Sequence, residues 1–200
     1  MKFSASELVK RSASQLLYKE LKKIQWAKTP RQFQGNQFAE EIVLKEHGSS
    51  EKRGIISIGE HALFFCVDMV KDNKLIEIKM VEDEDNYEEW YLQSSILQST
   101  FYATLATKVK VLDTPKFRRK EGYAQEYMFV PEDFVFELWF GENQKYQVFP
   151  DENLYNHYIN KLEIIAKGVE SANWEEARLF DFKYKFKEFK IFNPKFIRIA

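Results

Sequence analysis

The chain has 200 residues and a mass of 23.9 kDa, a length typical of one domain with room for a hydrophobic core. Hydrophobic residues make up 44% of the chain and aromatic residues 16%, which excludes an intrinsically disordered protein despite 30% charged residues. Thirty basic and 31 acidic side chains give a net charge of −1. No overall field therefore attracts nucleic acid or an anionic membrane, and a polyanionic partner would need a local basic patch.

The single cysteine, Cys66, excludes an internal disulfide and a cysteine-rich zinc or iron-sulfur site. It suits the cytoplasm or another reducing intracellular compartment, and we interpret it as a small buried apolar residue. The longest apolar run, from Ala62 to Val67, is far shorter than the roughly 20 residues of a membrane helix. The amino terminus also lacks a signal-peptide core, so we expect no membrane partner.

The first half of the chain predicts two helices and then three strands. Apolar residues recur at helical spacing over 5–26 and over 36–46, with Gly48 as a stop. β-Branched and aromatic residues predict strands over 54–58, 62–70 and 75–81. A two-residue turn at Asp72 and Asn73 should join the last two strands, because both residue types tolerate left-handed backbone angles.

The second half continues with an acidic loop at 82–85 and a long helix. Asn86 and Glu89 resemble a capping box, which predicts that this helix begins there and extends to about residue 107. Further strands are predicted over 109–112, 123–130 and 134–140, and a further helix over 151–171. Aromatic residues alternate with lysines up to residue 187, which predicts a strand over 180–187 with one solvated face.

These elements predict an α/β fold with a mixed central β-sheet flanked by helices, in a single domain over residues 1–200. The turn fixes the register of the hairpin, so that Val70 lies opposite Leu75 and Asp68 lies opposite Glu77. The other face of the hairpin is entirely hydrophobic and should belong to the core. Its residues are Phe65, Val67, Met69, Ile76, Ile78 and Met80.

We expect a cation between the opposed carboxylates of Asp68 and Glu77. At about 5 Å and an effective dielectric constant of about 20, two like charges repel by roughly 3 kcal/mol. Asp68, Glu77 and Lys79 could therefore hold a hard divalent ion such as Mg²⁺, with the ammonium group one strand step away. The alternative is a salt bridge between Lys79 and the carboxylates at a sheet edge.

An Asp on one strand and a Glu-x-Lys on the next strand of a hairpin resemble the signature of the PD-(D/E)xK nuclease superfamily. Here the matching residues are Asp68 and Glu77-Ile78-Lys79. Leu97 to Ala103 resembles the Q-x-x-x-Y motif of the RecB-like exonuclease branch, in which Gln98 and Tyr102 share one helical face. The resemblance implies a restriction-endonuclease-like core over residues 35–107, with residues 108–200 as a C-terminal elaboration.

The resemblance implies a metal-dependent nuclease that hydrolyses DNA phosphodiester bonds. The substrate would be single-stranded DNA or DNA ends, in replication, recombination or repair. Asp68 and Glu77 would bind Mg²⁺ or Mn²⁺, and Lys79 would assist the attacking water. A third ligand would come from the helix before the sheet, where Glu40 and Glu41 lie about equally far from the apolar stripe, with a slight preference for Glu41.

The sequence leaves other features of the metal shell open. His47 and His61 are alternatives for the third ligand, although a structural or exposed histidine is the preferred interpretation of each. Val67 stands where a proline often precedes the Asp in the family. The four cysteines of the iron-sulfur members are absent, so no iron-sulfur cluster is expected.

Two basic segments are candidates for contact with the DNA backbone. One is a loop with Lys116, Arg118, Arg119 and Lys120, and the other is the tail over 181–200. The resemblance also assigns Gln98 and Tyr102 to the nucleic-acid site, where Tyr102 would stack on a base. The chain has no helicase-type phosphate loop, so a helicase or another replication or recombination partner would supply any coupling to ATP.

Two rival functions remain for the same fold. One is a catalytically inactive nucleic-acid-binding or assembly module, and the other is an RNA endonuclease. A cellular and a viral host, exonuclease and endonuclease action, and any oligomeric state are all compatible with the sequence.

Overall fold

The computed structural model describes the chain except for residues 26, 28, 82–87 and 185–186. The strands are β1 (Lys2–Ser4), β2 (Ser49–Ile58), β3 (His61–Lys71), β4 (Lys74–Lys79), β5 (Val111–Asp113), β6 (Tyr127–Phe129), β7 (Val135–Phe140), β8 (Gln144–Val148) and β9 (Phe196–Arg198). The helices are α1 (Ala5–Lys10), α2 (Ala13–Lys22), α3 (Pro30–Lys45), α4 (Glu89–Ala106), α5 (Lys116–Lys120), α6 (Glu152–Ser171), α7 (Glu175–Tyr184) and α8 (Glu188–Phe192).

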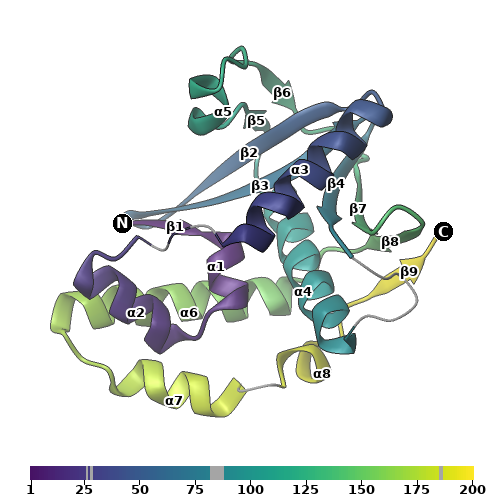
Figure 1. Ribbon diagram of the computed structural model, residues 1–200. Helices are drawn as coiled ribbons and strands as arrows, with labels where there is room; N and C mark the ends of the chain where they lie inside the picture. The colour runs from purple at the N-terminus through teal and green to yellow at the C-terminus, as the bar shows by residue number, and fades with distance from the viewer. Residues whose placement is uncertain (26, 28, 82–87, 185–186) are drawn as a thin grey trace.

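In the described part of the chain, the strands form one nine-stranded, mostly antiparallel sheet in the order β6-β5-β2-β3-β4-β7-β8-β9, with β1 parallel to β3. The pair β4 and β7 is also parallel. Figure 1 shows α3 on one side of the central strands, and α4 with α1, α2, α6 and α7 on the other side. The predicted α/β class with a mixed, helix-flanked sheet is therefore confirmed. No helix within the described ranges is long and apolar enough to span a bilayer.

The amino-terminal segment forms two helices instead of the single helix predicted over 5–26. The first ends at Lys10, because Arg11 is extended. Ser12 caps the second, because its hydroxyl accepts the Gln15 N–H and the Gln15 side chain accepts the Ser12 N–H. The next helix, α3, begins earlier than predicted because Thr29 and Gln32 form a second capping box around Pro30. Hydrophobic periodicity alone revealed neither the break between α1 and α2 nor the early start of α3.

The hairpin of β3 and β4 is confirmed. Its pairs include Val70 with Leu75, and Asp72 adopts φ 54° in the turn, as predicted. Most of the predicted apolar face is at most 5% exposed, while Met80 is only half-buried. Phe65 and Val67 belong to the large core cluster, and Met69, Ile76 and Ile78 pack with Ala39, Ile42 and Val43 of α3 and with Trp139.

The predicted strand over 180–187 is wrong. Residues up to Tyr184 belong to α7, residues 185 and 186 lie outside the described residues, and α8 begins at Glu188. Phe180 is 6% exposed and stacks on His157, whereas Phe182 is 86% exposed. The alternating aromatic residues thus do not share one face, because helical spacing brings Phe180 beside Tyr184. The strands β1, β8 and β9 were not predicted.

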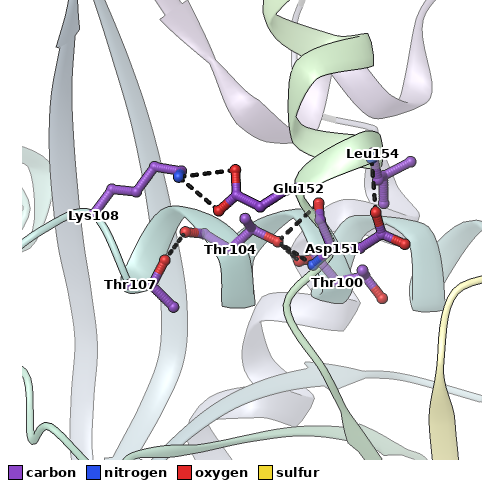
Figure 2. Close-up of polar contacts among 7 residues, drawn as sticks. All are labelled: Thr100, Thr104, Thr107, Lys108, Asp151, Glu152 and Leu154. Carbon is purple, nitrogen blue, oxygen red and sulfur yellow. Dashed lines mark hydrogen bonds and ion pairs between the residues drawn. The ribbon is translucent and has the colours of Figure 1, made fainter.

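The long helix is confirmed as α4, whereas the acidic loop and the Asn86 cap lie outside the described residues. Its residues from Ser95 to Ala106 are all buried. Figure 2 shows how α6 is attached to it. The Thr104 hydroxyl donates to the Thr100 carbonyl at 2.9 Å and accepts the Asp151 N–H at 2.8 Å. Asp151 caps α6 by accepting the Leu154 N–H, and Lys108 pairs with Glu152.

Thr104→Val is expected to lower the free energy of unfolding by about 1–2 kcal/mol, because the Asp151 N–H loses its acceptor at a buried helix junction. Thr107→Val is the matched control, since it removes only a local hydroxyl that donates to the Thr104 carbonyl from an exposed position. It should cost less than about 0.5 kcal/mol. Urea denaturation of both variants measures the difference, and equal losses would contradict the importance of this junction.

Candidate active site

The hairpin opens where the predicted acids lie. The ladder between β3 and β4 ends at Met69 and Ile76, one pair before the predicted pair of Asp68 with Glu77. The Asp68 Oδ2 instead accepts the backbone N–H of Ile78 at 2.7 Å. A side-chain carboxylate thus replaces the strand pairing and competes with the backbone for that donor. On the same side of β3, β1 pairs only with residues 62–64, so the described β3 residues 65–68 face an opening in the sheet.

The predicted acidic pair and its lysine come together at this opening. Burial, followed by the charge of Glu77, raises the pKa of Asp68 to about 8. The Lys79 ammonium forms an ion pair with the Glu77 Oε1. Burial alone would lower the pKa of Lys79, but the charges of Glu77 and Asp68 outweigh it and raise that pKa. The lysine is not at a sheet edge, because β4 lies between β3 and β7.

The helix α4 brings Gln98 and Tyr102 to the same place. The Gln98 amide donates to the Glu77 Oε1 at 2.8 Å, which holds this carboxylate from the helix side. Tyr102 packs on Phe65 with ring centroids 5.6 Å apart and is 3% exposed. Burial raises the pKa of the Tyr102 phenol well above its usual value, so the hydroxyl stays protonated. Both side chains are therefore oriented by contacts within the protein.

A cavity of about 600 Å³ leads to the opening, and α3 contributes Glu40 to its wall. Asp68 and Tyr102 also line this cavity. Glu41, the residue slightly preferred from the sequence as the third acid, is exposed and is not part of the wall, so of the two candidates the structure brings Glu40 to the cavity. The reason is the rotation of α3, whose buried stripe at Ala39, Ile42 and Val43 faces the sheet and turns Glu40 to the cavity.

The two histidines do not join the acids. His47 is exposed and follows α3 in a left-handed conformation at φ 54°. His61 lies at the start of β3, where its Nδ1 contacts the amino-terminal amine at 3.3 Å and its ring packs on Phe3. Both positions agree with the preferred structural interpretation of these residues.

The predicted basic loop is the short helix α5. Lys116 and Lys120 are exposed, and Arg119 is half-buried. Arg118 instead turns into the cavity and forms ion pairs with Glu40 and Glu51. Of the four predicted contacts with the DNA backbone, the structure thus places one beside the candidate acids. The second predicted basic segment, the tail, divides among helices and β9.

Sequence analysis missed two charged residues of the site. Glu51 lies on β2 between Ser50 and Lys52, which pair with Met69 and Val67, so it stands opposite Asp68. The predicted strand began only at residue 54, because the polar run before it gave no strand signal. Burial, opposed by Arg118, raises the pKa of Glu51.

Lys10, at the end of α1, is the second residue that was missed. Part of its side chain reaches solvent, but desolvation by the surrounding protein, followed by the charge of Lys79, lowers its pKa to about 8. The charges of Glu77 and Asp68 oppose this shift. Lys10 also lines a second cavity, of about 700 Å³, together with Arg11 and Arg178.

Cys66 also lines the first cavity. Burial, followed by the charge of Glu51, raises the pKa of this thiol well above its usual value. The reactive thiolate is therefore disfavoured, in agreement with a structural role.

The acids of the site have donor chemistry that suits a divalent metal. Within the described ranges, no group of three or more His, Cys, Asp or Glu side chains is arranged to hold a metal ion. Two acids nevertheless fit the chemistry, because Asp68 and Glu77 lie close together and the buried Glu77 Oε2 has no hydrogen-bond partner among the described residues. Paired carboxylates with an unused oxygen form the donor set that Mg²⁺ and Mn²⁺ prefer.

Comparisons of this chain with protein-family models, curated proteins and solved structures give no match. The site itself therefore provides the functional argument. It consists of the buried Glu77 and the half-buried Asp68, a lysine paired with Glu77, a glutamine that orients Glu77, and an acidic cavity that reaches Asp68.

Proposed function

We propose that the protein is a metal-dependent nuclease that hydrolyses DNA phosphodiester bonds on a restriction-endonuclease-like PD-(D/E)xK core. The observation that carries this proposal is the Asp68 carboxylate that accepts the N–H of Ile78, the residue next to the buried Glu77, where β3 and β4 separate. Two carboxylates in such a partly desolvated place repel each other, so a folded protein keeps them only with a compensating gain. Binding a divalent cation is such a gain.

The order of the elements also supports the proposal. The helix α3 supplies Glu40, β3 supplies Asp68, β4 supplies the Glu-x-Lys, and α4 supplies the glutamine and tyrosine. This is the order of the family motifs that the sequence resembles. The mixed sheet flanked by helices is compatible with that core.

Asp68 and Glu77 would hold a Mg²⁺ or Mn²⁺ ion, and Glu40 would be available from the cavity wall. When bound, such an ion would supply polarisation of the phosphate and a lower pKa of a water molecule. Lys79 lies beside Glu77 and orients the attacking water. Gln98 fixes Glu77 through its Oε1 and leaves the Oε2 open to a ligand.

The substrate must bring its phosphates to an acidic cavity, and a chain with net charge −1 has to attract them locally. Arg118, which pairs with Glu40 at the cavity, and Lys10, whose pKa responds to the charges of Asp68 and Glu77, are the proposed sources of this attraction. Single-stranded DNA or a DNA end is the proposed substrate, as the resemblance to the RecB-like exonuclease branch implies. A helicase or another replication or recombination protein is the proposed partner.

A catalytically inactive nucleic-acid-binding or assembly module is the second candidate. One observation favours it, because Lys79 and Arg118 already neutralise Glu77 and Glu40 without a metal. An RNA endonuclease would use the same carboxylates. Substrate tests separate these three functions.

Purified protein with Mn²⁺ is expected to degrade end-labelled single-stranded DNA, because the acids can then bind the metal that activates water. Addition of EDTA should stop the reaction, and the Asp68→Asn variant should be at least about 10³-fold slower. Duplex DNA and RNA of the same sequence are the parallel substrates, and denaturing gels measure the products. Cleavage of RNA alone would support the RNA endonuclease, and nucleic-acid binding without any cleavage would support the inactive module.

A further inference from the structure

Arg118 makes contacts that are unusual for a residue in a basic surface segment. Its guanidinium contacts three carboxylates, at 2.5 Å from Glu40, 3.1 Å from Glu51 and 3.1 Å from Glu121. Its side chain is 11% exposed. Burial alone would lower the pKa of Arg118, but the contacts with Glu40 and Glu51 outweigh it and raise that pKa.

Two of these carboxylates belong to the candidate site. Glu40 and Glu51 line the cavity that Asp68 lines, and Glu51 stands opposite Asp68 on the neighbouring strand. Glu40, Glu51 and Asp68 would repel one another strongly in a partly desolvated cavity. Arg118 therefore provides, in the metal-free protein, the positive charge that a divalent cation would otherwise provide.

The segment that carries Arg118 holds its backbone in place. Thr114 and Glu126 close the base of this excursion between β5 and β6, which stands beyond β2 at the top of Figure 1. The Arg118 carbonyl accepts the N–H groups of Glu121 and Tyr123, and the guanidinium carbon lies 5.4 Å from the centre of the Tyr123 ring. The long side chain can therefore change partners by rotation about its own bonds, without movement of the strands.

In a nuclease, a guanidinium group that leaves a carboxylate can pair with a phosphate of the substrate. Its planar fork of donors matches the oxygens of a phosphate as well as those of a carboxylate. A metal at Glu40 and the Arg118 guanidinium at the same carboxylate compete for its oxygens. When a metal binds there, the cation that it displaces lies at the wall of the cavity through which a phosphate would enter.

The geometry points to Arg118 as an exchangeable counter-ion, which pairs with Glu40 and Glu51 in the metal-free protein and moves to a substrate phosphate when a divalent cation occupies the acids. This inference rests on the proposed nuclease function. It gives Arg118 a role that Lys116 and Lys120 on the same helix do not have, because their side chains are exposed and do not line the cavity.

The first test compares Arg118→Gln with Lys120→Gln, which removes one positive charge from the same helix. Isothermal titration measures Mn²⁺ binding, and fluorescence anisotropy measures binding of a labelled single-stranded oligonucleotide in the presence of Ca²⁺. Arg118→Gln should bind Mn²⁺ about tenfold more tightly and the oligonucleotide about tenfold more weakly, the loss of one charge-assisted contact. Lys120→Gln should leave Mn²⁺ binding unchanged. Unchanged Mn²⁺ affinity in a folded Arg118→Gln protein would overturn the exchange.

A second pair of variants decides the question if Arg118→Gln does not fold. Glu40→Gln removes one of the three carboxylates that pair with Arg118, whereas Glu41→Gln removes the same charge from the neighbouring exposed position of α3. Without metal, Glu40→Gln should bind the oligonucleotide about fivefold more tightly than Glu41→Gln, because a guanidinium with one carboxylate fewer exchanges more readily to phosphate. Equal affinities of the two variants would overturn the inference.

Mn²⁺ binding and DNA cleavage by the wild-type protein distinguish a failure of the counter-ion exchange from a failure of the proposed nuclease function. A wild-type protein that binds Mn²⁺ and cleaves DNA, with variants that behave like their controls, overturns only the counter-ion exchange. A wild-type protein that binds no Mn²⁺ overturns the nuclease function together with the exchange.

Discussion

Asp68→Asn is expected to raise the melting temperature of the metal-free protein at pH 8. The carboxyl of Asp68 has a pKa of about 8 in the folded protein, far above the value of about 3.9 in an unfolded chain. Between these two values the folded state binds more protons than the unfolded state, so stability falls as the pH rises from about 4 to about 8. Asparagine has the same shape and keeps an oxygen acceptor for the Ile78 N–H, but it carries no charge.

Thermal melts in EDTA from pH 5 to pH 8.5 measure this effect. The wild-type melting temperature should fall across the window, and the Asp68→Asn curve should be flatter. At pH 8 we expect a gain of at least about 1 kcal/mol, which corresponds to about 2–4 °C in a chain of this size. Saturating Mn²⁺ should raise the melting temperature of the wild-type protein at pH 8 and leave that of Asp68→Asn nearly unchanged.

Asp113→Asn is the matched control, because it removes a carboxylate that pairs with Arg53 at 2.8 Å on the strands β5 and β2. Loss of this half-buried ion pair should lower the melting temperature at pH 8 instead of raising it. If Asp68→Asn also melted at or below the wild-type temperature, Asp68 would not be a carboxylate destabilised by its neighbours. The argument for a cation at this place would then lose its energetic basis.

The hairpin could be predicted from the sequence because its signals are local. Asp72 and Asn73 specify the turn, and the turn specifies the register that brings Asp68 to the level of Glu77. Gln98, which contacts Glu77, was indicated by the resemblance to the Q-x-x-x-Y motif and not by a local structural signal. The end of the ladder at the Asp68 side chain could not be predicted, because a carboxylate and a carbonyl are interchangeable acceptors for one N–H group.

The rest of the site depends on contacts between distant residues. Arg118 reaches Glu40 across 78 positions and Glu51 across 67, and no local pattern encodes such distances. The choice between Glu40 and Glu41 depended on how α3 rotates against the sheet, which the apolar stripe alone did not settle. In the tail, a clear local pattern predicted the wrong element. Phe182 fits a period of two in the sequence, which indicated a strand, but it lies on the solvent side of a helix.

Lys79→Met is expected to reduce DNA cleavage by about 10²–10⁴-fold, the usual contribution of a group that positions or protonates in the transition state. Methionine keeps the length of the buried side chain and removes the ammonium that contacts Glu77. Asp68 and Glu77 remain, so Mn²⁺ should still bind with an affinity at least equal to that of the wild type. Single-turnover cleavage at saturating Mn²⁺ measures the chemical step, and isothermal titration measures the metal.

Lys74→Met is the matched control on the same strand, since it removes a lysine that pairs with Glu137 on β7. Glu137 keeps the Trp139 indole as a donor, so this variant should fold and cleave DNA within about threefold of the wild type. Equal rates in the two variants would reduce Lys79 to a structural partner of Glu77.

Lys79→Arg separates charge from proton transfer at the same position. Arginine retains a cation beside Glu77, but its guanidinium cannot give up a proton near neutral pH and is planar where the ammonium is compact. If Lys79 only balanced the charge of the two acids, Lys79→Arg would recover most of the wild-type rate. We expect it to remain at least about tenfold slower, because the ammonium orients the attacking water between the carboxylates and the phosphate, and a bulkier guanidinium displaces that water.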